Sequence, residues 1–403
     1  MPISLQISNP VKLNKTQRNG SLTSFSGSYH GWHKIDLEGA VLSLREGSRP
    51  PRIEILVSFL HQCRKQRNLI HAKFFQSYLQ RHGLVSHKSI GNLVVSLLVD
   101  VGCLSDAQTA FDMLVSKNEY SWNSIVSGHA KYGEFEYAFI MYKKMREGSV
   151  PTSPHTFVAL LKSCAKTQCI QRGREVHADT ILERFERELF VGSTLVDMYA
   201  KCGELAKAQQ VFDDLLTHDV VSWNALMSGY AKHGKGEEAL VCLKQMESEG
   251  IRPNIVTFIC SLKACGIVGD ADEGRLLNAE IARKGLLDKH CFVGNALVDM
   301  YAKCGLLAMA EEVFDSLLDQ GVISWNSLIT GYVKHGCCKE ALNCFEEMRL
   351  DLVTPNSVTF VCILKSCSIL GDVEKGREIH AMIERSGLMT DSIVGNALVD
   401  MYA

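Results

Sequence analysis

The sequence lacks the motifs that would place the protein in a common enzyme or membrane class. No Cys-x-x-Cys pair and no His-x-Glu motif occurs in its 403 residues, so the zinc-deaminase signature is absent. No uninterrupted apolar run of about 18 residues exists, which argues against a transmembrane helix. No cluster of metal ligands and no nucleophile–base pair stands out. We therefore expect no catalysis, no metal and no cofactor within these residues.

The chain also lacks the surplus of basic residues that is typical of nucleic-acid-binding proteins. Its formal net charge is −2. Residues 1–52 hold seven Lys/Arg and three acidic residues, which leaves 36 basic against 42 acidic residues in the remainder. A nucleic-acid partner usually requires a basic surface. Charge alone therefore gives no support to RNA binding.

Acidic residues are missing from the first 35 positions. This segment carries Lys12, Lys15, Arg18 and Lys34 among six serines and two threonines, and has no continuous apolar region for secretion. Such a composition is typical of an organelle transit peptide. We expect residues 1–52 to be a transit peptide and disordered leader for a mitochondrion or chloroplast, with the mitochondrion slightly favoured. The alternative is a disordered tail without a targeting signal.

Cysteine, by contrast, is plentiful, with fifteen residues. Several recur at matching places, Cys202 and Cys304 before a glycine and Cys164, Cys265 and Cys367 after a Leu-Lys-Ser/Ala phrase. A cysteine that recurs on an apolar helix face is a small buried hydrophobic residue rather than half of a disulfide. This pattern indicates a reducing compartment.

The strongest positive feature is long-range internal repetition. The ten residues 293–302 recur letter for letter at 394–403, with a near copy at 191–200, and the phrase Ser-Trp-Asn occurs at 121–123, 222–224 and 324–326. Self-similarity at fixed spacing is the signature of a solenoid. Earlier copies of the decapeptide continue Lys-Cys-Gly, so we expect the sequence to be truncated and to lack a C-terminal part.

One unit, 220–254, predicts two short helices. The first is expected over about 222–232, with Leu226, Gly229 and Tyr230 on one face, and ends at Gly234 in a left-handed conformation. The second is expected over about 237–248, before a Gly/Pro turn. Neither helix can bury its apolar stripe alone, so we expect antiparallel hairpins that stack on one another.

Units of three lengths alternate in strict rotation. Units of 35 residues (119–153, 220–254 and 322–356) precede units of 35 or 36 (154–188, 255–290 and 357–391), and units of 31 (189–219 and 291–321) follow. This rotation resembles the pentatricopeptide repeat family, and within it the plant organellar class with alternating P, L and S repeats. Tetratricopeptide repeats differ, because their period is uniformly about 34 residues with another residue pattern.

The resemblance covers residues 53–403 and implies an all-α, right-handed α-solenoid. The expected units are the leader at 1–52, a degenerate L repeat at 53–87, S repeats at 88–118, 189–219 and 291–321, P repeats at 119–153, 220–254 and 322–356, L repeats at 154–188, 255–290 and 357–391, and a truncated S repeat at 392–403.

The resemblance further implies sequence-specific binding of single-stranded RNA from organellar transcripts, one base per P or S repeat. Relatives of this class often carry a C-terminal deaminase-like domain and direct C-to-U editing, so other editing proteins are expected partners. Two alternatives stay open. A protein-binding scaffold without base readout is favoured mildly by the acidic array, and a decayed gene product is suggested by the abrupt end and the worn first units.

In such repeats, the fifth and last residues select the base, and the second residue packs against neighbouring bases. The resemblance places base selection at Asn92 with Asn118, Asn123 with Ser153, Ser193 with Asp219, Asn224 with Asn254, Asn295 with Gly321, Asn326 with Asn356, and Asn396. It places base packing at Phe190, Val221, Phe292 and Ile323. Two departures are the missing side chain of Gly321 and the bulky Tyr120 at a second position.

The family pattern predicts the target order Y-C-n-G-Y-n-Y-Y-n-Y, read from the RNA 5′ end. The L units carry Val158, Ile259 and Val361 at the fifth position, where an aliphatic side chain cannot read a base edge, so they are expected to act as spacers. The alternative for any one asparagine is that it caps a neighbouring helix or bonds the backbone. His177 and His380 in matching His-Ala phrases, and the Asp-Met-Tyr phrases at Asp197, Asp299 and Asp400, are interpreted as repeat framework.

Overall fold

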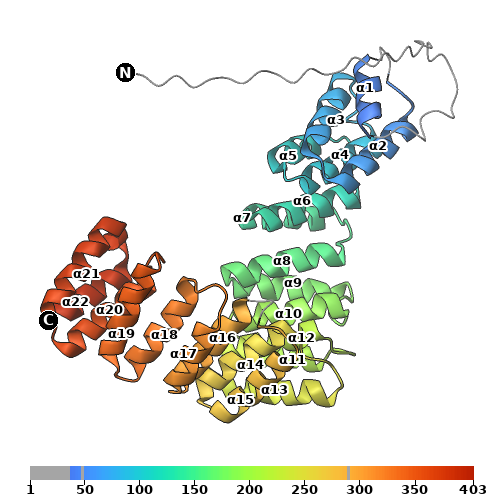
Figure 1. The fold of residues 1–403 in the computed structure, drawn as a ribbon. Coiled ribbons are helices and arrows are strands. Elements are labelled where there is room, and N and C mark those ends of the chain that lie inside the picture. The colour runs from blue at the N-terminus through green and yellow to red at the C-terminus, as the bar shows by residue number, and fades with distance from the viewer. Residues whose placement is uncertain (1–36, 47–49, 288–290) are drawn as a thin grey trace, which may run out of the picture.

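The computed structural model describes residues 37–46, 50–287 and 291–403 of the chain. Within these ranges every regular element is a helix and no strand is present, which confirms the expected all-α class. The helices follow one another in pairs along a curved path from α1 to α22 (Figure 1). No helix in the described part is both long enough and apolar enough to cross a bilayer.

Each repeat supplies one first helix and one second helix, except the last, which supplies only the first helix α22. The first helices are α2 (Ile53–Gln66), α4 (Lys88–Asp100), α6 (Glu119–Tyr132), α8 (Pro154–Thr167), α10 (Leu189–Lys201), α12 (Val220–Lys232), α14 (Ile255–Val268), α16 (Cys291–Lys303), α18 (Val322–Lys334), α20 (Ser357–Leu370) and α22 (Ser392–Tyr402). The second helices are α3 (Leu69–Arg81), α5 (Leu104–Asp112), α7 (Phe135–Glu147), α9 (Ile170–Leu182), α11 (Leu205–Asp213), α13 (Gly236–Ser248), α15 (Ala271–Arg283), α17 (Leu307–Asp315), α19 (Cys338–Leu350) and α21 (Val373–Ser386), and a single-turn helix η2 (Leu388–Thr390) precedes α22.

The helices form two layers. Every first helix packs against the first helices before and after it, from α2 through α22. The second helices pack mainly against the first helices of their own and the next repeat. One continuous layer of first helices therefore carries the same face of every repeat.

Local chemistry sets where the helices begin and end. Asp219 caps α12 and forms a reciprocal capping box with Ser222, so this helix begins at Val220, two residues before the expected start. Gly234, at φ +74°, adopts the left-handed conformation that was expected to follow the helix. The difference between the 31-residue and 35-residue units lies in the second helix, because α11 has 9 residues and α13 has 13.

Glycine allows first helices to approach closely. A Cβ atom added to Gly229 on α12 would lie 2.4 Å from Cβ of Ala200 on α10. The same approach recurs one triplet later, where a Cβ at Gly331 would lie 2.5 Å from Cβ of Ala302. The Gly-Tyr and Tyr-Ala phrases of the sequence are thus the two sides of one helix–helix contact.

The recurring cysteines are buried as expected in the L repeats. Cys164, Cys265 and Cys367 are at most 1% exposed, and burial raises the pKa of the Cys164 thiol to about 12. Cys202 and Cys304 are only half-buried, and their Sγ atoms lie 3.9 and 3.7 Å from the carbonyl oxygens of Cys164 and Cys265. All cysteines in the described ranges are free thiols, and no group of His, Cys, Asp or Glu there has the geometry of a metal site.

The recurring histidines take part in contacts between repeats, and the recurring aspartates form ion pairs within their own helix. Nδ1 of buried His177 lies 2.8 Å from the hydroxyl of Tyr199 on the next first helix. His380 and Tyr402 repeat this contact at 3.1 Å. Asp197 forms an ion pair with Lys201 at 2.8 Å on the same helix. These contacts are consistent with the interpretation of both phrases as repeat framework.

One expectation about the N-terminal segment is wrong. Residues 37–46 fall within the expected disordered leader, but they form helix α1 (Leu37–Glu46). Leu37, Ala40, Val41 and Leu44 are each at most 6% exposed, because their apolar spacing gives this helix one face that packs onto the first repeat. The transit-peptide interpretation of residues 1–36 lies outside the described residues.

Candidate nucleic-acid interface

Apolar side chains are exposed at the second position of the first helices. Phe190, Val221, Phe292 and Ile323, the expected base-packing residues, are between 50% and 65% exposed. Single exposed apolar residues are ordinary on protein surfaces, but this set recurs once per repeat at one position. These side chains therefore form a row along the first-helix layer, with exposed apolar surface at regular intervals.

The row continues through Tyr120, which the sequence analysis noted as a departure, and through three residues that it missed. Tyr120, Val256, Val358 and Ile393 occupy the same second position and are between 51% and 75% exposed. Val256 and Val358 belong to L repeats, which were treated as spacers because of their aliphatic fifth residue. Their position in the repeat, which is the same as that of Val221 and Ile323, could have identified them from the sequence.

Polar side chains meet at the junction between each P repeat and the following L repeat. At one of them, Oδ1 of buried Asn224 accepts a hydrogen bond of 2.7 Å from the hydroxyl of Thr257. Nδ2 of Asn224 donates at 3.1 Å to Oδ1 of Asn254, which caps α14. Asn224 keeps one N–H and one oxygen lone pair for a further partner. The expected fifth-position and last-position residues are thus adjacent and bonded.

The same junction recurs in the third triplet. Thr359 donates to Oδ1 of Asn326 at 2.6 Å, and Nδ2 of Asn326 donates to Asn356 at 3.0 Å. Asn356 caps α20. Two junctions that are about one hundred residues apart therefore present the same amide edge.

The first of these junctions is a variant. Thr156 donates to Oδ1 of Asn123 at 2.7 Å, and the backbone N–H of Ser153 donates to the same oxygen at 3.0 Å. Ser153 caps α8 and does not bond the Asn123 amide nitrogen, which instead donates to the Pro151 carbonyl at 3.4 Å. The Asn123 oxygen has both lone pairs occupied, so its one remaining amide N–H is the group that it offers to a further partner.

Asn92 differs from these. Its Nδ2 donates to the carbonyls of Lys88 at 2.6 Å and Ser116 at 3.3 Å, and its Oδ1 accepts from the backbone N–H of Asn118 at 3.2 Å. Asn92 is 3% exposed, and Asn118 caps α6. The backbone-bonding alternative describes Asn92 better than an outward-facing amide does.

The Ser193 and Asp219 side chains are not bonded to each other. Ser193 is buried and its hydroxyl donates to the Leu189 carbonyl at 2.5 Å. Oδ1 of Asp219 accepts from the backbone N–H groups of Val221 and Ser222 at 3.1 and 2.8 Å, as an N-cap. Each side chain keeps lone pairs available, which suits acceptance from a donor-rich base edge.

The remaining expected site residues form fewer hydrogen bonds with their neighbours. Oδ1 of Asn295 is buried and has no hydrogen-bond partner among the described residues. Ser324, at the place that Thr257 takes beside Asn224, donates instead to the Gly321 carbonyl at 2.8 Å. Asn396 on α22 is exposed. Val158 is 4% exposed and Ile259 and Val361 are half-buried, so the L repeats present no polar edge at this position.

A hollow of about 560 Å³ joins two repeats on this face. It is lined by Phe190, Ser193, Asp219, Val221 and Asn224, all of which were expected site residues, together with Lys162. The structure therefore brings the second, fifth and last positions of neighbouring S and P repeats around one space.

A second hollow, of about 380 Å³, lies one repeat earlier. Its lining includes His155, Phe190 and three lysines, Lys131, Lys162 and Lys166. The His155 ring is nearly perpendicular to that of Phe190, with centroids 5.4 Å apart. None of these basic residues was singled out from the sequence.

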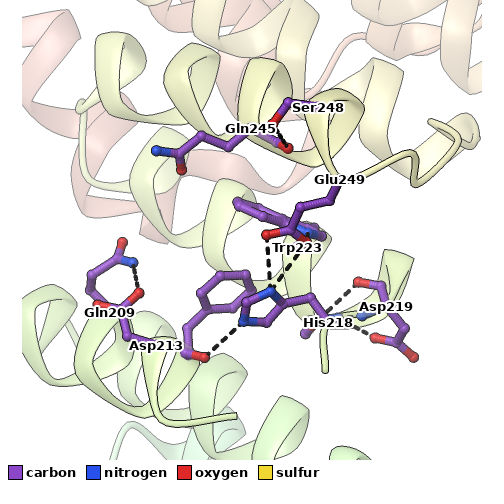
Figure 2. Close-up of polar contacts among 10 residues, drawn as sticks. Gln209, Asp213, His218, Asp219, Trp223, Gln245, Ser248 and Glu249 are labelled. Carbon is purple, nitrogen blue, oxygen red and sulfur yellow. Dashed lines mark hydrogen bonds and ion pairs between the residues drawn. The ribbon is translucent and has the colours of Figure 1, made fainter. Parts of the chain in front are cut away.

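Behind the face, a cluster fixes the start of α12 (Figure 2). Nε1 of Trp223 donates to Glu249 at 3.3 Å, and Nδ1 of His218 lies 3.2 Å from the same carboxylate. The His218 ring stacks on Phe212 with a centroid distance of 4.1 Å. Asp219 directly follows His218, so the cluster holds this last-position residue in place.

Comparison with known proteins identifies the repeats. Residues 117–166, 218–266 and 320–369 match the PPR repeat family profile, and residues 193–220 and 295–322 match the PPR repeat profile. The chain is 34% identical over 349 residues to the chloroplastic pentatricopeptide repeat-containing protein At4g18520 of Arabidopsis thaliana, covering 87% of this chain and 56% of that protein. It is 32% identical over 326 residues to the mitochondrial protein At2g03380 of the same plant, covering 79% and 47%.

The chain thus spans about half the length of the curated relatives it matches. Among solved structures, it is similar to the crystal structure of the pentatricopeptide repeat protein PPR10 in complex with an 18-nt psaJ RNA element. That match has 18% identity and a TM-score of 0.45, and covers 92% of this chain and 66% of the other. On the repeat profiles and these relatives, the chain belongs to the pentatricopeptide repeat family.

Proposed function

We propose that the protein binds single-stranded RNA in a sequence-specific manner along the face of its first helices. The observation that carries this proposal is that exposed apolar second residues recur along the first helices, and that Phe190 and Val221 line one hollow together with the polar residues Ser193, Asp219 and Asn224. Repeat proteins that read RNA stack unstacked bases and hydrogen-bond their edges in this way.

Asn224 and Asn326 give the proposal its physical basis. Each amide is held by two neighbouring side chains and keeps one N–H and one lone pair. A base whose edge does not complement this pair leaves a polar group unsatisfied, at a cost of about 1–3 kcal/mol. We infer one base per P or S repeat from residue 119 onward, with the order n-C-n-G-Y-n-Y-Y-n-Y, because Asn92 of the 88–118 repeat is buried and bonded to the backbone.

We further propose that the RNA is an organellar transcript and that the protein supplies the specificity for C-to-U editing or another RNA modification. The chloroplastic and mitochondrial names of the relatives support an organelle, and the alternation of 35-, 35/36- and 31-residue units supports the editing class. Sequencing organellar transcripts from a line that lacks the protein would test this: loss of one C-to-U change supports it, and an unchanged set contradicts it.

RNA binding itself is tested by titrating the protein with the ten-nucleotide target, an all-purine control and a target changed only at the fourth position. We expect tight binding of the target, poor binding of the purine control and an intermediate result for the single change. The second candidate function, a protein-binding scaffold, is favoured by the 42 acidic against 36 basic residues after position 52. Equal, weak binding of all three oligonucleotides would favour the scaffold.

A further inference from the structure

The three L repeats at 154–188, 255–290 and 357–391 carry a lysine that the proposed base readout does not use, whereas the degenerate L repeat at 53–87 has His61 at the same place. Lys162 on α8, Lys263 on α14 and Lys365 on α20 occupy the ninth position of their repeats, and all three are exposed. Each lies four residues after the aliphatic fifth residue, Val158, Ile259 or Val361. Residues four apart lie on the same face of a helix, so the lysines share the face that carries the fifth position.

These lysines lack the counter-charges that other lysines of this face possess. None of the three forms an ion pair or hydrogen bond with any described residue. In the S repeats at 189–219 and 291–321 the ninth residue is an aspartate, and Asp197 and Asp299 form ion pairs with Lys201 and Lys303 at 2.8 and 2.7 Å.

The P repeats differ again. Their ninth residue is Ser127, Ser228 or Thr330, which carries no charge. Their lysines Lys232 and Lys334 donate to the carbonyl oxygens that end the preceding first helices, at 3.2 and 3.0 Å. The ninth residue of the L repeats therefore supplies a cation once per triplet that the fold does not neutralise.

The position of Lys162 shows what such a cation faces. It lines the hollow formed by Ser193, Asp219 and Asn224, and also the hollow formed by His155 and Phe190. Lys162 thus lies between the hollow proposed to hold the base read by the 189–219 repeat and the hollow on its N-terminal side, along which the RNA strand would continue. In a single strand, the group between two successive bases is a backbone phosphate.

We propose that the L repeats bind the RNA backbone, with Lys162, Lys263 and Lys365 each contacting one phosphate of the strand. This inference rests on the proposed RNA-binding function. A lysine ammonium binds phosphate as a point charge. Phosphate contacts set the register of a strand without reading its sequence. The L repeats would then be backbone clamps at every third repeat rather than passive spacers.

The test compares two triple variants of the full chain. The first is Lys162→Gln with Lys263→Gln and Lys365→Gln. The matched control is Lys144→Gln with Lys244→Gln and Lys339→Gln, which removes three exposed lysines from the second helices of the P repeats. Both variants change the net charge equally, and glutamine has a helix propensity close to that of lysine. Circular dichroism melting of both variants reports on folding.

Affinity for the ten-nucleotide target is measured from 50 to 200 mM salt. Each phosphate contact on a single strand contributes about −0.7 to the slope of log K against log salt. We expect the first variant to lose about 2 units of slope, so that wild-type affinity falls roughly 20-fold more than that of the variant across this range. The ranking of bases at the fourth position should stay unchanged, and the control should keep the wild-type slope.

Three results would overturn the inference. If the first variant keeps the wild-type slope while wild type binds the target, the lysine contacts are absent and the proposed function stands. If both variants lose the same slope, the effect is general charge and no L-repeat clamp exists. If wild type binds no single-stranded RNA, the proposed function fails and the lysine contacts fail with it.

Discussion

The hydroxyl of Thr257 donates a hydrogen bond of 2.7 Å to the side-chain carbonyl of Asn224, which lies in the preceding repeat. Thr156 with Asn123 and Thr359 with Asn326 repeat this bond at 2.7 and 2.6 Å. The amide proposed to read a base is therefore oriented by the L repeat that follows it.

The first prediction removes this orientation. Thr257→Val keeps the shape of the buried side chain but takes away the donor to Asn224. The free energy of unfolding should fall by about 1–2 kcal/mol, because a buried acceptor loses its partner. Base discrimination opposite the 220–254 repeat should weaken in competition binding. Thr257→Ser, which keeps the hydroxyl, is the control; a valine variant with wild-type discrimination would show that the threonine does not position Asn224.

The second prediction changes one base preference. Ser193→Asn beside Asp219 replaces a hydroxyl by an amide that offers both donors and an acceptor. In the family pattern, a fifth-position Asn combined with a last-position Asp prefers uracil. The base preference of the protein at the fourth RNA position should therefore move from G to U by about 1–3 kcal/mol. A gel-shift competition with oligonucleotides varied only at that position measures it. Identical base rankings for wild type and variant would refute the assignment of the fifth position.

The third prediction concerns the contact between first helices. In Gly229→Ala, the new Cβ would lie 2.4 Å from that of Ala200, so α10 and α12 must separate. Overpacking typically costs about 1–3 kcal/mol, more than the roughly 1 kcal/mol gained in helix propensity. The urea midpoint should fall. Gly395→Ala is the matched control on α22, because an added Cβ there meets nothing within 4 Å, and its midpoint should not fall.

The fourth prediction concerns pH. Burial lowers the pKa of His177, so the folded state holds this ring neutral, and burial raises the pKa of its partner Tyr199 to about 12. The unfolded chain binds the proton at the ordinary histidine pKa of about 6.5. Below this pH the unfolded state holds more protons than the folded state. The contribution of the neutral His177 ring to the free energy of unfolding is therefore fully present above the ordinary histidine pKa and declines as pH falls below it.

His177→Asn should reduce this acid sensitivity. The next L repeat already carries Asn278 at the equivalent place, and its Nδ2 donates to the Tyr301 hydroxyl at 3.1 Å. Urea unfolding at pH 7 and pH 5 should show a smaller difference in unfolding free energy for the variant than for wild type. An equal difference in both proteins would exclude His177 as a source of the pH dependence.

The sequence predicted the repeats because their phrases recur, and it located the helices of 220–254 to within two residues because glycine marks where they end. The start of α12 was placed two residues late, because Asp219 was interpreted as a base-selecting residue and not as an N-cap. It did not predict α1, since a single amphipathic helix without a repeat phrase directly follows the hydroxyl-rich segment and was counted with it as leader.

The hydrogen bond between Asn224 and Thr257 could also not be predicted from the sequence. Its partners lie 33 positions apart, and only the packing of one hairpin on the next brings them together. Likewise, the three copies of Ser-Trp-Asn look equivalent in sequence. Nε1 of Trp223 bonds Glu249, but Nε1 of Trp325 is buried with no partner among the described residues, because Asp351 replaces the glutamate.

The last residue of a P or S repeat begins the next helix, as Asn118, Asp219, Asn254 and Asn356 show. Side chains that cap a helix well are few, mainly Asn, Asp, Ser and Thr, and losing one costs about 1 kcal/mol. If the same residue also selects a base, only these four residue types can change the base preference without a loss of helix capping. Specificity for a new RNA target would then evolve by substitutions among Asn, Asp, Ser and Thr at the last position, and each substitution would leave the solenoid folded.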